Sequence, residues 1–200
     1  MLLFGATMVV WLLRLMPQYV GSDVRAYAVW MIGSIAWFLV FLLATKKIDL
    51  SALTQGAFGI AAPALGALGA VDIVTHRLPR QITYTTFVLF FALLFAGSSR
   101  TWMKSAGLLI GTFLMVLIIG LLRIVSRGSL GIGDVHLAVL LGALIGWFDP
   151  YQVVVACVVM SISAAVVSGG LVLSRRRKRS DFIAYGPFML FGTAVAILGA

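Results

Sequence analysis

Long apolar runs alternate along this chain with short polar breaks. A transmembrane helix needs roughly 20 predominantly apolar residues, and runs close to that length recur from one end of the sequence to the other. The pattern predicts eight helical spans, at residues 1–13, 26–45, 50–74, 82–97, 105–125, 134–148, 152–173 and 182–200. The first span is short, because Arg14 and Pro17 are expected to interrupt it. We therefore expect an all-α integral membrane protein, a bundle of about eight transmembrane helices with short loops, forming a single domain over residues 1–200.

The composition supports a membrane protein and excludes other classes. Of the 200 residues, 62% are hydrophobic and only 10% are charged, which leaves too little polar surface to cover a soluble globule. The net charge of +9 would suggest nucleic acid binding in a soluble protein, but here the basic residues flank apolar runs. We therefore expect no nucleic acid partner. The single cysteine, Cys157, lies inside an apolar run, so no disulfide framework and no paired-cysteine zinc site is predicted.

The basic residues predict how the chain is oriented in a cell membrane. Of the fifteen Lys and Arg, eleven fall after odd-numbered spans, and four fall after even-numbered spans. The positive-inside rule therefore places the odd loops in the cytoplasm and both termini outside. Five of the eleven form the run at residues 175–179, which we expect to lie against anionic lipid headgroups.

Aspartate supplies every acidic side chain, because the sequence contains no glutamate. The six are Asp23, Asp49, Asp72, Asp134, Asp149 and Asp181. Asp49 and Asp149 fall on the outer side in the predicted topology, while Asp23 and Asp181 lie beside cytoplasmic arginines that offer ordinary solvated partners. Asp72 and Asp134 are left as candidates for acid chemistry.

Asp72 closes the third span and Asp134 opens the sixth, with two complete spans between them. Each span reverses the direction of the chain, so both carboxylates are expected at the cytoplasmic face. Two aspartates at one depth on separate helices are what a water-activating aspartic protease requires, since one carboxylate takes a proton while the other gives one. The alternative is a pair of independent interfacial aspartates, each satisfied by a nearby His or Arg.

Glycines precede Asp134 at positions 128, 131 and 133, and predict an irregular backbone that lets another chain segment approach closely. Asp134 then lies in the first turn of a helix, where the helix dipole favours an ionised carboxylate. Asp72 lies near the end of a helix, where the dipole disfavours charge. Helix polarity thus predicts that Asp134 is the anionic base and Asp72 the acid that holds the proton.

Three segments resemble the motifs of a known membrane protease family. They are Val71-Asp72-Ile73-Val74-Thr75-His76-Arg77-Leu78-Pro79 followed by Gln81-Ile82-Thr83, then Gly131-Ile132-Gly133-Asp134-Val135-His136-Leu137, and Tyr185-Gly186-Pro187-Phe188. Together, in this order, they resemble the type IV prepilin peptidases, which are GxGD-type aspartic proteases. The resemblance covers roughly residues 50–200, and the chain looks like a short form that lacks the N-terminal cysteine-containing domain of longer members.

The resemblance implies roles for particular residues. Asp72 and Asp134 correspond to the two catalytic aspartates, Gly131 and Gly133 shape the approach to Asp134, and Gly186 and Pro187 belong to a third element that shapes the substrate-binding backbone. It also implies a pilin-like precursor as the protein substrate, cut at the cytoplasmic membrane boundary, with no metal and no organic cofactor. The sequence departs from the family pattern in two places. His136 stands where Lys is common, and Arg80 stands where Asn or Asp often follows the proline.

Other interpretations stay open at this stage. A transporter or channel subunit could use the two aspartates for protons or cations, and a member that has lost hydrolysis could serve as an assembly scaffold. The glycine pair at 169 and 170 and small residues at 161–165 are expected to mark close helix contacts. The oligomeric state is not predicted.

Overall fold

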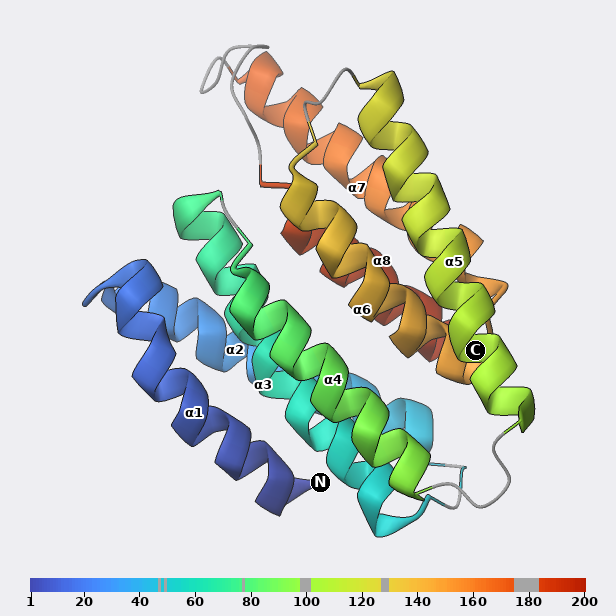
Figure 1. The fold of residues 1–200 in the computed structure, drawn as a ribbon. Helices are drawn as coiled ribbons and strands as arrows, with labels where there is room; N and C mark the ends of the chain where they lie inside the picture. The colour runs from blue at the N-terminus through green and yellow to red at the C-terminus, as the bar shows by residue number, and fades with distance from the viewer. Residues whose placement is uncertain (47, 49, 77, 98–101, 127–129, 175–183) are drawn as a thin grey trace.

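The computed structural model describes residues 1–200 except 47, 49, 77, 98–101, 127–129 and 175–183, and the side chains of 102–105. The described residues form eight helices and no strands (Figure 1). These are α1 (Leu2–Val20), α2 (Val24–Thr45), α3 (Ala52–Thr75), α4 (Arg80–Gly97), α5 (Trp102–Val125), α6 (Ile132–Phe148), α7 (Gln152–Leu173) and α8 (Gly186–Gly199). The predicted all-α fold is confirmed, with helices close to the predicted boundaries.

The first helix differs from its prediction. Helix α1 runs unbroken for 19 residues through Arg14 and Pro17, so the expected interruption is wrong. Pro17 lies in the last turn, where the helix ends with the Gly21 N–H bonded to the Pro17 carbonyl at 3.0 Å. Its missing N–H removes one backbone bond, while Leu12 and Met16 are fully buried on the same helix. The apolar face of α1 therefore carries the helix past the proline.

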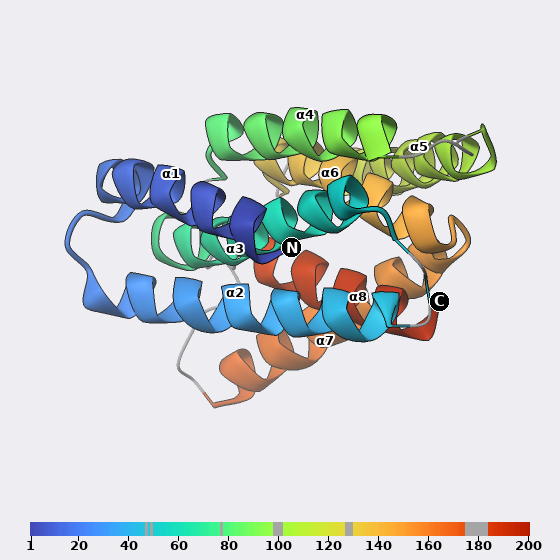
Figure 2. The ribbon, with the colours of Figure 1, turned by 90° about the horizontal axis from the view of Figure 1, so that it is seen from below.

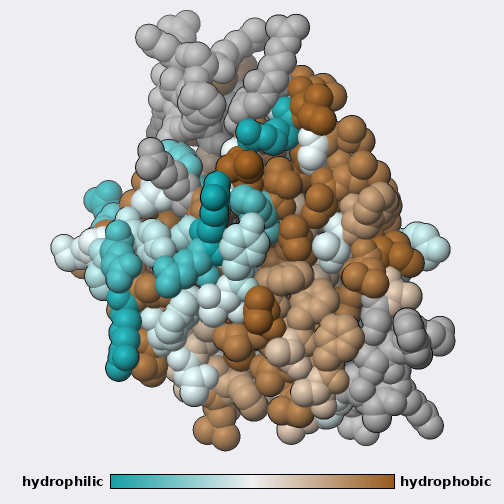
Figure 3. Space-filling view, in the orientation of Figure 1, coloured by the Kyte–Doolittle hydropathy of each residue, from teal (hydrophilic) through white to brown (hydrophobic). Residues whose placement is uncertain are grey.

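Six of the described helices are long and apolar enough to cross a membrane, whereas α6 and α8 are shorter. Helix α8 has 14 residues, which gives roughly 21 Å at 1.5 Å per residue, less than the roughly 30 Å of a bilayer core. On the face shown in Figure 3, hydrophobic side chains cover most of the described surface, and hydrophilic ones gather near the ends of α1 and α4. The protein is a multi-pass membrane protein, and α6 and α8 are the shortest of the described helices.

Helix α3 occupies the centre of the bundle, with α1, α2, α4 and α8 around it (Figures 1 and 2). Every residue from Gly56 to Asp72 is buried. Small residues allow this close packing. A Cβ on Gly66, for example, would lie 2.6 Å from the backbone nitrogen of Ser34 on α2. The sequence of α3 therefore places Asp72 at the end of the most enclosed helix.

Helices α5 and α6 meet along a seam of four glycines. Gly107 and Gly111 on α5 face Gly146 and Gly142 on α6, and a Cβ on Gly111 would lie 2.5 Å from the carbonyl oxygen of Gly142. Each pair has the Gly-x-x-x-Gly spacing that lets helix backbones approach closely. The seam holds α6, and with it Asp134, against α5.

The glycines at 169 and 170 behave differently from the prediction. No described atom lies within 4 Å of a Cβ built on either Gly169 or Gly170, so the expected close helix contact at this pair is wrong. Helix α7 instead meets α8 nearer its own N-terminus, where a Cβ on Gly192 of α8 would lie 2.5 Å from the carbonyl oxygen of Ala156. The close approach between these two helices comes from a single glycine on α8.

The helices alternate in direction, so the C-terminal ends of α1, α3, α5 and α7 lie at the same end of the bundle as the N-terminal ends of α2, α4, α6 and α8 (Figures 1 and 2). We call this end of the bundle the site end. It carries the end of α3 with Asp72 and the start of α6 with Asp134. The parity of the predicted spans thus gave the correct relative placement of these two residues.

Candidate active site

Asp72 lies one turn before the end of α3 and is only 4% exposed. The helix ends at His76, whose backbone N–H donates to the Asp72 carbonyl at 2.9 Å and whose φ of 51° is left-handed. This conformation closes a helix but is uncommon for a residue other than glycine. Helix α3 therefore ends within one turn of Asp72, and α4 begins at Arg80.

The carboxylate of Asp72 is held by the first turn of α8. The backbone N–H of Gly186 donates a 2.9 Å hydrogen bond to Asp72 Oδ2. A Cβ at position 186 would lie 2.6 Å from the same oxygen, so a side chain there would push the carboxylate aside. Pro187 follows in the first turn of α8, where its missing N–H costs the helix nothing. The third sequence motif thus contacts the first.

Asp134 lies in the first turn of α6, as predicted, and is 7% exposed. Its Oδ2 accepts a 2.9 Å hydrogen bond from the backbone N–H of Gly131, and its own N–H donates to the Gly131 carbonyl at 3.2 Å. A carboxylate that reaches back to the start of its helix satisfies a donor that the helix leaves unpaired. This arrangement fixes the direction of the Asp134 side chain.

The segment before Asp134 packs against the linker that follows Asp72. A Cβ on Gly133 would lie 3.0 Å from Leu78 Cβ, so glycine lets α6 begin close to the linker between α3 and α4. Tyr185, directly before α8, is also close enough to Asp134 for an electrostatic interaction. The three sequence motifs therefore meet at one place at the site end.

Asp72 and Asp134 both lie at the site end, on α3 and α6. Two buried carboxylates that interact cannot both be charged without a large cost, so a pair of this kind favours one shared proton. Each carboxylate accepts one backbone N–H on its Oδ2, from Gly186 and Gly131 respectively. Asp72 thus faces the N-terminus of α8 as well as ending α3. The polarity of α3 alone does not assign the proton, because the prediction left out this second helix.

The two histidines have different surroundings. The ring of His136 packs against Tyr84 on α4, with ring centroids 5.4 Å apart, and its buried Nδ1 has no hydrogen-bond partner among the described residues. His76 is exposed and acts electrostatically on Asp72.

The remaining predicted residues lie away from the pair or outside the described part of the chain. Asp23 caps α2 by accepting the Arg25 N–H at 2.9 Å, and Asp149 ends α6 at the opposite end of the bundle. The residues outside the described part are Asp49, Gly128, Asp181 and the basic run 175–179. Among the described residues, no group of three or more His, Cys or Asp could hold a metal ion.

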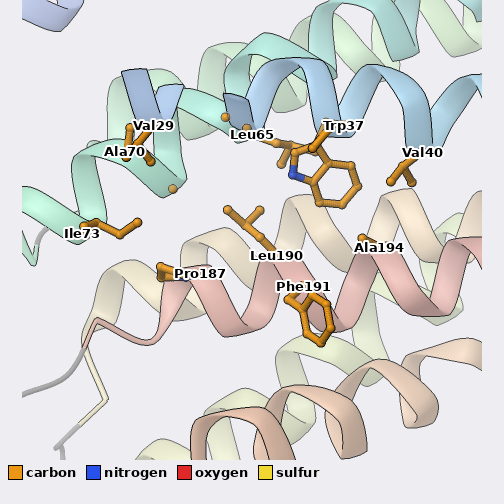
Figure 4. Close-up of a pocket in the computed structure, with 14 residues that line it drawn as sticks. Val29, Trp37, Val40, Leu65, Ala70, Ile73, Pro187, Leu190, Phe191 and Ala194 are labelled. Carbon is orange, nitrogen blue, oxygen red and sulfur yellow. The ribbon is translucent and has the colours of Figure 1, made fainter. Parts of the chain in front are cut away.

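An apolar groove of about 230 Å³ lies between α2, α3 and α8 (Figure 4). It is lined by Val29, Gly33, Ala36, Trp37, Val40, Leu65, Gly66, Gly69, Ala70, Ile73, Pro187, Leu190, Phe191 and Ala194. Ile73 directly follows Asp72, and Pro187 directly follows Gly186, so one end of the groove lies near the site end. Apart from Pro187, sequence reasoning missed these residues, because on each helix they look like ordinary packing positions.

Comparison with known proteins identifies the family. A family model described as the type IV leader peptidase family matches residues 59–169, which is more than half of the chain. The chain belongs to the type IV leader peptidase family. The matched range contains Asp72 and Asp134, whereas Gly186 lies beyond it. Comparisons with curated proteins and with solved structures gave no match. The predicted family is confirmed, and this type IV leader peptidase family member is in general terms a membrane peptidase.

Proposed function

We propose that this protein is an aspartic endopeptidase that removes the leader peptide from type IV pilin-like or pseudopilin precursors. The observation that carries the proposal is that Asp72 and Asp134 are both buried and lie at the same end of a membrane bundle. A buried pair of carboxylates on separate helices has the composition of an aspartic protease site. Membership of the type IV leader peptidase family supplies the class of substrate.

In the proposed reaction one carboxylate is ionised and the other holds a proton. The ionised carboxylate takes a proton from water, and the resulting hydroxide adds to the carbonyl carbon of the scissile peptide bond. The second carboxylic acid gives its proton to the carbonyl oxygen. Collapse of the tetrahedral intermediate breaks the carbon–nitrogen bond. The amide nitrogen takes the proton from the carboxyl that received it from water, and a hydroxyl of the intermediate gives its proton to the other carboxylate. The aspartates end the cycle sharing one proton, and no metal or organic cofactor takes part.

The enclosed position of the pair supports this chemistry. Gly186 and Gly131 hold one oxygen of each carboxylate at 2.9 Å, which leaves the second oxygen of each carboxylate for water or substrate. Fixed donors of this kind keep the catalytic groups oriented before the substrate arrives. Gly131 and Gly133 keep the approach to Asp134 narrow but free of side chains, and Gly186 and Pro187 form the corresponding wall on α8.

We place the site end at the cytoplasmic boundary of the cell membrane, with both termini outside. The distribution of Lys and Arg supports this orientation, because eleven of fifteen follow odd-numbered spans in the sequence and so belong to the loops predicted to be cytoplasmic. Anionic lipid headgroups would lie against these loops. A leader peptide on the cytoplasmic side would reach the aspartates without crossing the bilayer.

The apolar groove supports a substrate with an apolar segment next to its cleavage site. The groove extends along α8 from Pro187 to Ala194, roughly 10 Å at 1.5 Å per residue. Its lining is almost entirely apolar. An extended or helical apolar segment lying there would present the adjoining peptide bond to Asp72.

Cleavage by the purified protein tests this function. The protein is reconstituted in vesicles with a pilin-like precursor that has a basic leader followed by an apolar segment, and the products are mapped by mass spectrometry. The expected result is one cut between the leader and the apolar segment. A matched precursor in which a polar sequence replaces the apolar segment should not be cut. Absence of any cleavage in wild-type protein that is folded in vesicles would contradict the proposed function.

A further inference from the structure

Arg123 in the last turn of α5 has a contact that separates it from the other described arginines. It is partly buried, and its Nη1 donates a hydrogen bond to the carbonyl oxygen of Leu130, seven residues later. Arg14, Arg25 and Arg80 are exposed. A basic residue that only sets membrane topology needs no such contact, because its side chain can remain in water or among headgroups.

The carbonyl that Arg123 contacts belongs to the peptide group that holds Asp134. The same peptide unit joins Leu130 to Gly131, and its N–H donates the 2.9 Å bond to Asp134 Oδ2. The guanidinium, the peptide group and the carboxylate therefore form one continuous chain of hydrogen bonds. The cation fixes one side of the peptide plane, and the carboxylate accepts from the other.

This arrangement has two physical consequences. An amide whose oxygen accepts a hydrogen bond from a cation is polarised, so that its N–H becomes a stronger donor. The plane of the peptide is also fixed at both edges, which restricts the direction from which its N–H can reach the carboxylate. Arg123 in addition acts electrostatically on Asp134, as does Asp72 from α3.

We propose that Arg123 is a positioning residue, which orients the Leu130–Gly131 peptide group and through it the carboxylate of Asp134. The inference rests on the proposed function in that it takes Asp134 as a reacting group. Arg123 does not touch the substrate in this account. Its loss acts on the orientation of Asp134 and therefore on the chemical step, while substrate binding in the apolar groove is retained.

The sequence allows the peptide group to be observed directly. Only five Leu–Gly peptide bonds occur, ending at Gly66, Gly69, Gly131, Gly142 and Gly199. Protein labelled with ¹³C at leucine carbonyls and ¹⁵N at glycine therefore gives five carbonyl–amide correlations in NMR spectra of the whole protein in micelles. A Leu130→Val variant removes one correlation and assigns it. In Arg123→Met, the Leu130 carbonyl carbon and the Gly131 amide proton are both expected to move upfield, while the other four correlations stay in place.

Kinetics test whether the orientation matters for catalysis. Arg123→Met is expected to lower kcat at least ~10-fold, as displaced catalytic groups do, and to leave KM within about 2-fold because the groove is intact. Arg123→Lys keeps a cationic donor and should recover part of kcat, whereas Arg123→Gln keeps a donor without charge and should recover less. Arg25→Met, which removes an exposed cation from the same end of the bundle, should leave kcat unchanged.

The outcomes separate this inference from the proposed function. Unchanged correlations in Arg123→Met would overturn the positioning role of Arg123. Shifted correlations with an unchanged kcat would overturn it as well. A rise in KM alone would also overturn it, since that result assigns Arg123 to binding. If Arg123→Met does not fold, Arg123→Lys and Arg123→Gln are compared instead, and their NMR correlations, kcat and KM are judged in the same way. A wild-type protein that cleaves no precursor contradicts the proposed function instead, and the NMR comparison still tests the link from Arg123 to Gly131.

Discussion

The backbone N–H of Gly186 donates a 2.9 Å hydrogen bond to Oδ2 of Asp72, although 114 residues separate them. This bond joins the first turn of α8 to the last turns of α3, and so connects the first and third sequence motifs. It supplies a buried carboxylate with a donor that its own helix lacks. The position of Asp72 therefore depends on a helix at the other end of the chain, beyond the range of the family match.

The Gly186–Asp72 bond predicts the effect of a single methyl group. In Gly186→Ala the new Cβ would lie 2.6 Å from Asp72 Oδ2, so the carboxylate must turn away from its donor. Cleavage is expected to fall by on the order of 100-fold, as displacement of a catalytic group by about 1 Å can do. The measurement is kcat/KM with a pilin-like precursor.

The control for Gly186→Ala is Gly170→Ala. Position 170 has no described atom within 4 Å of a new Cβ, and alanine favours the helix by up to about 1 kcal/mol over glycine. This variant should keep full activity. Equal losses of activity in the two variants would show that the contact with Asp72 is not the cause.

The contact between Gly133 and Leu78 predicts a compensating pair of substitutions. A Cβ at position 133 would lie 3.0 Å from Leu78 Cβ, so Gly133→Ala should displace the start of α6 and reduce cleavage. Leu78→Gly removes the obstructing Cβ. The double variant should therefore be more active than the product of the two single effects, since residues in contact do not act additively. Strict additivity of the two losses in kcat/KM would contradict this contact.

Sequence reasoning predicted the placement of the two aspartates for a simple reason. Each crossing reverses the chain, so two complete spans between Asp72 and Asp134 return them to one end, whatever the helix rotations are. The partners of each carboxylate depend on those rotations and on how α8 docks. The bonds from Gly186 to Asp72 and from Arg123 to Leu130 were therefore not predictable from spacing.

The difference at Pro17 has a local cause. The rule that proline interrupts a helix overestimated the effect of Pro17, because burial of the apolar face of α1 outweighs one lost backbone bond. In contrast, the glycines at 107 and 111 and those at 142 and 146 have a spacing that is visible in the sequence. Their repeated four-residue interval was a usable signal for close packing of α5 on α6.

The glycine seam predicts a stability effect that is separate from catalysis. Gly142→Leu would place its Cβ 2.6 Å from the Gly111 carbonyl oxygen, and the two helices would have to separate. The variant is expected to unfold at a lower temperature than wild type in the same detergent, because overpacking costs typically 1–3 kcal/mol. Gly120→Leu is the control, since no described atom lies within 4 Å of a Cβ there. A similar Tm for both variants would contradict the close contact of α5 and α6.

The apolar groove predicts a variant with impaired binding. Ala194 lines the groove, and Ala194→Phe would fill much of its far end. KM for a precursor is expected to rise several-fold with kcat nearly unchanged, because the aspartates are untouched. The neighbouring Val195 is 36% exposed and does not line the groove, so Val195→Phe should leave both constants near wild type. Unchanged KM in Ala194→Phe would argue against substrate binding in the groove.

The central claim is that Asp72 and Asp134 act together to hydrolyse a peptide bond. Its most direct test is the single-turnover cleavage rate of a pilin-like precursor by reconstituted Asp72→Asn, Asp134→Asn and Asp149→Asn. Asparagine keeps the shape of the side chain but cannot accept and return a proton, whereas Asp149 lies at the opposite end of the bundle. We predict no detectable cleavage by either of the first two variants and a wild-type rate for the third. Cleavage at the wild-type rate by Asp72→Asn or by Asp134→Asn would contradict the account.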